Sequence, residues 1–197
     1  VIDFSLPASL EKTVVVCREA RKPLVTGITG LSQAQIGMLR QAAADIPVVF
    51  APNMSVGVNL MFKVAGQVAK VLGDSFDVEI VETHHRFKRD APSGTARRLA
   101  EIIAESLGRD LNKVACYGRE GISGERPRDQ IAIHAVRSGD VVGEHTVVFG
   151  ALGERFEITH RAHSRDTFAR GAVVAARFVA AAKPGLYDMQ DVLGLKD

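Results

Sequence analysis

The chain has 197 residues, enough for one or two domains with a hydrophobic core. Hydrophobic residues make up 46% of it and charged residues 24%, proportions that exclude a disordered or fibrous protein. The net charge is +2, from 25 basic and 23 acidic residues, and the basic residues are spread along the chain. This distribution argues against nucleic acid as the main partner and leaves small anions open as ligands.

The cysteines, the hydropathy and the first residues bear on the environment of the protein. Cys17 and Cys116 are too few for a disulfide framework and are not spaced as zinc ligands, which indicates a reducing cytosol. With no run of about 18 apolar residues and no secretory signal, we expect no membrane association. The start, Val1-Ile2-Asp3-Phe4-Ser5, lacks an initiator Met and has the pattern of a strand. We therefore expect that a preceding segment has been removed.

The first third of the chain alternates short β-rich runs with amphipathic stretches, which is typical of βαβ units and a parallel sheet. Ser32 and Gln35 form a capping box that predicts the start of a helix. The stretch 56–72 is apolar nearly all round and ends at Gly73, so it predicts a largely buried helix. The predicted strands are 1–4, 23–26 and 46–50, and the predicted helices are 7–22, 32–45 and 56–72.

The pattern changes after Gly73. We expect a strand over 77–83, a polar loop over 86–93, a helix over 94–107 and a long loop over 117–130. Strands over 130–137, 141–149 and 155–162, joined at two glycine turns, predict an antiparallel meander, and a helix over 166–182 follows. The fold class is α/β: a partial Rossmann-like dinucleotide-binding domain (1–55 and 165–197) and an α/β substrate and oligomerisation domain with a mixed sheet (56–164).

The densest polar cluster lies where the strand 77–83 ends and the next helix begins. His84 and His85 are adjacent, so a regular strand directs only one of them into a cleft. Lys88 follows on the loop, and Ser93-Gly94-Thr95 opens a helix whose N–H groups suit a carboxylate or phosphate. An imidazole, an ammonium and a helix start so close together favour a site for an anionic substrate that also receives a proton.

Two other interpretations of this cluster remain open. Paired histidines are often partly buried strand residues, and a basic loop is often only a solvated loop. A zinc site is the other competitor, but the chain has no H-E-x-x-H pair and His84 and His85 are not one helical turn apart. We therefore predict no metal.

A second candidate site consists of the loops that follow two predicted parallel strands. Open α/β sheets bind their ligands at the carboxyl ends of such strands. Turns between strand and helix need Gly, Asn and Thr in any case, so each loop alone is weak evidence. The residues are Gly27, Ile28 and Thr29 in the first loop and Ala51, Pro52, Asn53 and Met54 in the second.

The stretch Glu82 to Ala96, E-T-H-H-R-F-K-R-D-A-P-S-G-T-A, closely resembles the signature of the dihydrodipicolinate reductase family. The resemblance extends over nearly the whole chain. Further matching segments are Asp3-Phe4-Ser5, the turn from Val25 to Gly30, Asn53 to Asn59, Gly143 to Thr146, Gly153 to Arg155 and Ile158 to His160.

This resemblance implies a reaction and a set of substrate residues. The reaction is the reduction of 4-hydroxy-tetrahydrodipicolinate to tetrahydrodipicolinate by NADH or NADPH, in the diaminopimelate route to lysine. His84 is implied as proton donor or acceptor and Lys88 as a second proton donor. His85, Ser93, Gly94 and Thr95 are implied to bind a small dicarboxylate substrate. The resemblance also implies a cytoplasmic homotetramer in which the mixed sheet pairs between subunits.

The resemblance further implies that Gly27 to Thr29 and Ala51 to Met54 contact the cofactor, with Arg165 as a cofactor or closure contact. Ile28 and Met54 replace the family's more usual Thr and Phe, so we expect backbone rather than side-chain contacts there. The family's first strand and its G-x-G-x-x-G-type turn have no counterpart in this chain. The alternatives are another two-domain nicotinamide reductase, of the aspartate or homoserine dehydrogenase type, and a non-catalytic oligomerising fragment.

Overall fold

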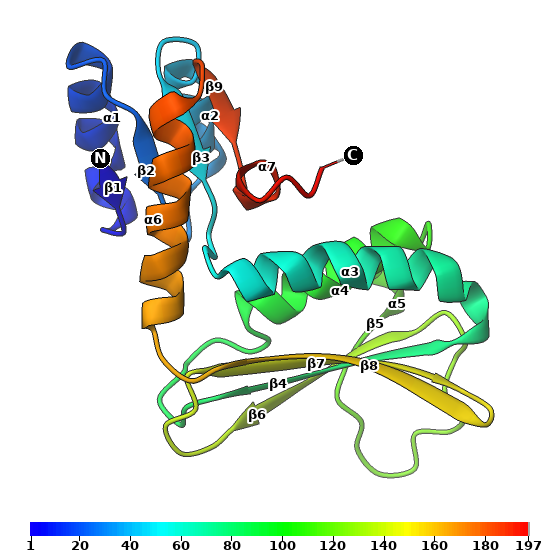
Figure 1. Cartoon of the computed structure of the whole chain (residues 1–197). Coiled ribbons are helices and arrows are strands. Elements are labelled where there is room, and N and C mark those ends of the chain that lie inside the picture. The colour runs from blue at the N-terminus through cyan, green and yellow to red at the C-terminus, as the bar shows by residue number, and fades with distance from the viewer. Residues whose placement is uncertain (197) are drawn as a thin grey trace. The chain divides into compact units, whose positions relative to one another are not determined.

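The computed structural model describes residues 1–196. Its contacts divide the chain into two compact units, residues 1–59 with 166–197 and residues 60–165. We call them the first and the second unit and describe each by itself. The element labels are those of Figure 1.

The first unit is built on a four-stranded parallel sheet with the strand order β1-β2-β3-β9. The strands are β1 (Ile2–Asp3), β2 (Leu24–Thr26), β3 (Pro47–Phe50) and β9 (Gly185–Tyr187). The helices are η1 (Pro7–Ser9), α1 (Leu10–Glu19), α2 (Gln33–Ala42), α6 (Asp166–Ala181) and α7 (Met189–Val192).

Helices cover both faces of this sheet because neighbouring strand residues point to opposite sides. Leu24 of β2 packs in a core cluster with residues of α1 and α2, whereas Val25 packs in another with residues of α6. The parallel, doubly covered sheet is the Rossmann-like arrangement that the sequence predicted. The capping box at the start of α2 is also confirmed, since Ser32 accepts a hydrogen bond from the Gln35 N–H and the Gln35 side chain accepts one from the Ser32 N–H.

The second unit has a five-stranded mixed sheet with the order β5-β6-β4-β7-β8. Its strands are β4 (Asp77–His84), β5 (Ala115–Tyr117), β6 (Ile131–Arg137), β7 (Gly143–Ala151) and β8 (Glu154–Ala162). Its helices are α4 (Gly94–Ser106), α5 (Leu111–Val114), most of α3 (Val56–Leu72) and the short η2 (Gly73–Ser75). The strands β5, β6 and β4 are parallel, β7 is antiparallel to β4, and β8 is antiparallel to β7.

The predicted meander of three strands is wrong, because β4 lies between β6 and β7. The turn Ser138-Gly139-Asp140 reverses the chain, as its residues indicate, but its backbone bonds to the end of β4. The Ser138 N–H donates to the His84 carbonyl and the Arg86 N–H donates to the Gly139 carbonyl. A turn motif thus predicts a reversal of the chain without saying which strand lies on either side.

The helix α3 has the predicted bounds, but it is less buried than its composition predicts. Val58, Met61, Ala65 and Ala69 are buried on one side, whereas the Val71 side of the helix is open, with that residue 84% exposed. The helix therefore lies on the sheet as a surface layer, together with α4 (Figure 1). The short elements α5, β5 and β9 were not predicted from the sequence.

The two faces of the mixed sheet differ in what they carry. Val78 and Ile80 of β4 point into a core cluster shared with α3 and α4. The alternate residues, Glu79 and Val81, point to the opposite face and are only partly buried. Among the described residues, no helix is long and apolar enough to cross a membrane.

Candidate functional site

The predicted proton-transfer residue lies at the end of β4, on the face that packs against the helices. Glu82 and His84 are two residues apart on the strand and therefore share that face. The strand register places Glu82 opposite His145 of β7 and His84 beside Arg137 of β6. Three strands of the sheet thus bring charged and titratable groups to one corner.

Glu82 is the centre of this corner, and it is fully buried. Its carboxylate accepts hydrogen bonds from His84 Nδ1 at 2.6 Å, from both terminal nitrogens of Arg137 at 2.8 Å each, and from the Ser93 backbone N–H at 3.0 Å. Burial raises the pKa of Glu82, but these donors outweigh the burial and the pKa lies below its usual value. Glu82 is therefore an ionised carboxylate, and the imidazole is the donor in its hydrogen bond with His84.

The other side of the His84 ring is bounded by β7. Its ring and that of His145 meet edge to face, with centroids 5.2 Å apart. A Cβ atom on Gly143 would lie 3.1 Å from His84 Nε2, so glycine keeps the approach to that nitrogen open. Burial lowers the pKa of His84, and Glu82 counteracts this by stabilising the charged imidazole.

The start of α4 is tied to the same group of residues. The Ser93 hydroxyl caps the helix by accepting from the Ala96 N–H at 3.1 Å, and it lies 3.0 Å from His145 Nε2. His145 is only 4% exposed, and burial, followed by the neighbouring His84, lowers its pKa to about 3. His145 is therefore neutral at ordinary pH, and its Nε2 and the Ser93 hydroxyl share one hydrogen bond.

The predicted substrate residues of α4 lie directly after this cap. Gly94 is exposed, and a Cβ atom there would meet nothing within 4 Å, so the backbone is accessible. Thr95 is partly buried in the same first turn. N–H groups in the first turn of a helix have no acceptor within the helix, so this end suits an anion.

Lys88, the predicted second proton donor, forms an ion pair with Asp90. Lys88 Nζ donates to both oxygens of Asp90, at 2.7 and 2.8 Å. This hydrogen bond lowers the pKa of Asp90. The side chain of Asp90 is 63% exposed and that of Lys88 19%, so the carboxylate of this pair is open to water and to exchange with another anion.

His85 does not share the surroundings of His84. It is partly buried, its ring centroid lies 6.3 Å from that of Phe87, and its Nδ1 is a buried atom with no hydrogen-bond partner among residues 1–196. Adjacent strand residues point to opposite sides, which explains the different surroundings. Within the described residues, no three or more His, Cys, Asp or Glu are grouped so as to hold a metal ion.

The two loops of the first unit follow the carboxyl ends of β2 and β3. At Gly27 a Cβ atom would lie 2.2 Å from the ring of Phe4, so the ring occupies the space that any other residue would need. Phe4 itself is 50% exposed, and Thr29 is exposed beyond it. Gly27 itself is buried under this ring, so the accessible groups here are Phe4 and Thr29. A half-exposed aromatic ring fits the flat, partly apolar nicotinamide end of a dinucleotide.

The side chains of Ile28 and Met54 are buried in the core clusters of the first unit. Met54 is fixed further by Gly171, where a Cβ atom would lie 1.7 Å from the Met54 carbonyl oxygen. Asn53 Oδ1 accepts from the Ser55 N–H at 2.9 Å, and its carbonyl accepts from Asn59. In the rest of this predicted set, Ala51 is buried, and Pro52 and Arg165 are exposed.

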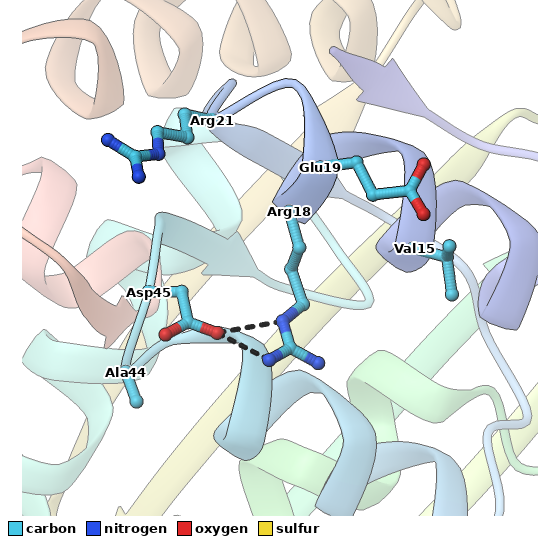
Figure 2. A pocket seen from close by; sticks show the side chains of 6 residues that line it. All are labelled: Val15, Arg18, Glu19, Arg21, Ala44 and Asp45. Carbon is cyan, nitrogen blue, oxygen red and sulfur yellow. Dashed lines mark hydrogen bonds and ion pairs between the residues drawn. The ribbon is translucent and has the colours of Figure 1, made fainter.

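A hollow of about 640 Å³ on the first unit lies elsewhere. It is formed where α1 and α2 end, and Arg18 crosses it to pair with Asp45 (Figure 2). These residues precede β2 and β3, so the hollow is at the amino ends of the strands, whereas the two loops follow the carboxyl ends. Its lining contains none of the predicted site residues: Val15, Arg18, Glu19, Arg21, Ala44 and Asp45.

Comparison with known proteins decides the family. The model of the dihydrodipicolinate reductase C-terminus matches residues 57–193, and that of the dihydrodipicolinate reductase N-terminus matches residues 1–54. The chain belongs to the dihydrodipicolinate reductase family. The resemblance inferred from the Glu82 to Ala96 motif is thereby confirmed, and a reductase family with a Rossmann-like N-terminal part implies use of a nicotinamide cofactor.

Curated relatives agree with this assignment. The 4-hydroxy-tetrahydrodipicolinate reductases of Geotalea uraniireducens and Hahella chejuensis are 59% and 58% identical over 196 residues, covering 100% of this chain and 73% of each relative. Among solved structures, a dipicolinate-bound dihydrodipicolinate reductase from Paenisporosarcina sp. TG-14 aligns with a TM-score of 0.74 and 27% identity. That alignment covers 96% of this chain and 72% of the other.

Sequence reasoning missed part of the corner around His84. Glu82 is not among the predicted site residues, although it lies two residues before His84 on a strand and therefore on the same face. Arg137, Gly143 and His145 come from strands more than fifty residues away. These residues reach His84 only because β4 lies between β6 and β7, and the predicted meander did not include that strand order.

Proposed function

We propose that this chain carries out the NADH- or NADPH-dependent reduction of 4-hydroxy-tetrahydrodipicolinate to tetrahydrodipicolinate, a step of the diaminopimelate route to lysine. A hydride and a proton are added to the substrate ring, and the 4-hydroxyl group leaves as water. The observation that carries the proposal is the Glu82–His84 pair beside the capped start of α4, in a chain 59% identical to a curated reductase of this name.

The substrate carboxylates bind at the first turn of α4. The accessible backbone at Gly94, with Thr95, presents N–H groups and the positive end of the helix dipole to one carboxylate. Lys88 binds a substrate oxygen in place of Asp90, whose carboxylate is exposed to water and can be displaced. His85 and Ser93 complete the set, Ser93 by holding the helix start in place.

His84 supplies the proton through Nε2. Its Nδ1–H is engaged with Glu82, and glycine at position 143 leaves Nε2 accessible. Burial lowers the pKa of the free imidazole, but a bound dicarboxylate adds negative charge nearby and raises that pKa again. Substrate binding therefore favours the protonated imidazole at the moment when the proton is needed.

The cofactor is held by the loops of the first unit. Its reduced nicotinamide supplies the hydride. Gly27 and Thr29 of the first loop and Pro52 and Asn53 of the second contact it. Ile28 and Met54 contribute only their backbone, because their side chains lie in the core. Arg165, exposed just before α6, is a further cofactor or closure contact.

The second unit also serves as the oligomerisation surface. On the face of its sheet opposite the helices, Val81 and Val148 are only partly buried and Val136 is 42% exposed. A partly apolar sheet face of this kind fits pairing with a second copy, and we propose a homotetramer. Cys17 and Cys116 are free thiols, which fits a reducing cytosol.

A thermal-shift titration tests the function. A ligand that binds only the native state raises the melting temperature, so pyridine-2,6-dicarboxylate and NADH should each stabilise the protein. Reductase activity should appear with 4-hydroxy-tetrahydrodipicolinate and not with aspartate 4-semialdehyde, which a homoserine dehydrogenase reduces, and the protein should not oxidise aspartate. Stabilisation by NADH alone would favour a different nicotinamide reductase, and stabilisation by neither ligand would favour a non-catalytic oligomerising chain.

A further inference from the structure

We infer that Glu82 is the positioning residue of this site: one buried carboxylate fixes both the direction of the His84 imidazole and the place of the α4 helix start relative to it. The inference rests on the proposed role of His84 in proton transfer. It adds to that role a residue that does not itself touch the substrate.

The hydrogen bonds of the carboxylate show this double attachment. Oε2 accepts from His84 Nδ1 and from one Arg137 nitrogen, and Oε1 accepts from the Ser93 N–H and from the other Arg137 nitrogen. A carboxylate has about four lone-pair positions, and here four donors occupy them. Glu82 therefore cannot turn to improve its bond to the imidazole without losing its bond to Ser93.

The bond to His84 determines which nitrogen exchanges the proton. Since an ionised carboxylate only accepts, His84 Nδ1 must carry a hydrogen, and the neutral imidazole is bare at Nε2. That nitrogen is the one beside Gly143. Without Glu82, both tautomers and other ring rotations become available, and only one of these arrangements places the proton correctly.

The bond to Ser93 connects the imidazole to the anion site. The Ser93 N–H belongs to the cap residue of α4, immediately before the Gly94 and Thr95 backbone groups proposed to bind a carboxylate. The two oxygen atoms of one carboxylate thus fix both the proton donor and the helix end that binds the substrate. Such fixed mutual placement is what lets a group transfer a proton efficiently.

The electrostatic consequence follows from the charges around His84. Glu82 on its own strand raises its pKa, whereas burial, Lys88 on the following loop and Arg137 of β6 lower it, and neutral His145 lies on the β7 side. Replacing the carboxylate by an amide removes the negative charge that counters these effects. The limb of the pH–rate profile that His84 controls should then move to lower pH.

The chain offers a matched control on the same strand. Glu79 lies on the opposite face of β4 and, like Glu82, accepts from arginine and histidine side chains, here Arg119, Arg126 and His134. Glu79→Gln therefore removes a partly buried strand carboxylate and its arginine–histidine network without touching the site. A merely structural role of Glu82 would make the two substitutions behave alike.

The test compares Glu82→Gln, Glu79→Gln, His84→Asn and the Glu82→Gln/His84→Asn double variant in the active enzyme. We expect Glu82→Gln to lower kcat at least tenfold and to shift the pH limb downward, with the KM for the dinucleotide unchanged, while Glu79→Gln keeps the profile. The double variant should be no slower than His84→Asn alone. Independent, multiplying losses would overturn the inference, as would a Glu82→Gln enzyme with normal kcat and pH profile.

Two further results distinguish failure of the inference from failure of the proposed function. If His84→Asn is slow and Glu82→Gln is normal, the inference fails and the proposed function stands. If His84→Asn itself is normal, the proposed proton role fails, and the inference fails with it. Should Glu82→Gln not fold, ¹⁵N NMR of the unaltered protein decides: the neutral His84 ring must carry its hydrogen on Nδ1, and a hydrogen on Nε2 would overturn the inference.

Discussion

Two carboxylates on one strand, Glu79 and Glu82, have nearly the same partners and different surroundings. Each accepts from arginine and from a histidine at 2.6 Å. Glu82 is fully buried on the helix-covered face, beside the start of α4. Glu79 faces the other side, where Arg119 and Arg126 of the long 118–130 segment bind it. The comparison shows that an ion network alone does not mark a functional site.

What distinguishes the two networks is the freedom of the histidine. His84 has one nitrogen held by Glu82 and the other beside a glycine that leaves space in front of it. His134 has its Nε2 bound to a carboxylate that also ties down a loop. The first arrangement leaves a proton-exchanging atom accessible to a ligand, and the second anchors a long connection to the sheet. The predictions below separate these two roles.

Removal of each histidine gives the sharpest separation. His84→Ala should lower kcat by about 10²-fold or more, the scale expected of a general acid–base group. His134→Ala should leave kcat within about twofold, because its loss weakens only the anchoring of a surface segment. Steady-state kinetics of both variants at several pH values measures this. Similar losses for the two variants would abolish the distinction drawn between the networks.

Acid stability should depend on Glu79. Burial raises its pKa, but Arg119, Arg126 and His134 together outweigh burial and lower the pKa to about 2. A carboxyl with a lowered folded-state pKa stabilises the protein above its unfolded pKa, and that stability is lost as pH falls through the folded pKa. The stability therefore declines from about pH 4.5 to about pH 2, by at most about 3 kcal/mol for this group.

The Glu79→Gln variant tests this directly. It should be less stable than the parent at neutral pH, and its free energy of unfolding should vary less between pH 4.5 and pH 2. Urea unfolding at a series of pH values gives both quantities. If the variant and the parent lose stability in parallel over that range, Glu79 is not the titrating group.

The proposed site is local in the sequence, whereas the sheet that holds it is not. His84, Lys88 and the start of α4 follow one another within a dozen residues, so a local motif suffices to propose them as one site. The period of two along a strand also places Glu82 beside His84. Arg137 and His145 reach this corner only because β4 lies between β6 and β7. Turn residues do not encode that order, since the pairing of β4 depends on which apolar strand faces fit under α3 and α4.

Access to His84 Nε2 should depend on Gly143. A methyl group there would lie 3.1 Å from that nitrogen, closer than a carbon normally approaches, and would obstruct the path of the proton. Gly143→Ala should lower kcat about tenfold. Gly150→Ala on the same strand is the control, because a Cβ atom there meets nothing within 4 Å. Equal activity of the two variants would place the proton path on another side of the ring.

The smallest expected effect concerns the Lys88–Asp90 pair at the edge of the site. In the proposed site Asp90 competes with the substrate for Lys88, and an ion pair with one exposed partner is worth about 0.2–1 kcal/mol. Asp90→Asn should therefore lower the KM for the substrate by up to about fivefold, with little change in kcat. Lys88→Ala should do the opposite, raising KM and lowering kcat, because it removes the cation itself. Added salt should reduce the difference between Asp90→Asn and the parent, since salt screens exposed charges. A higher KM in Asp90→Asn would mean that Asp90 holds Lys88 in its working position and does not compete for it.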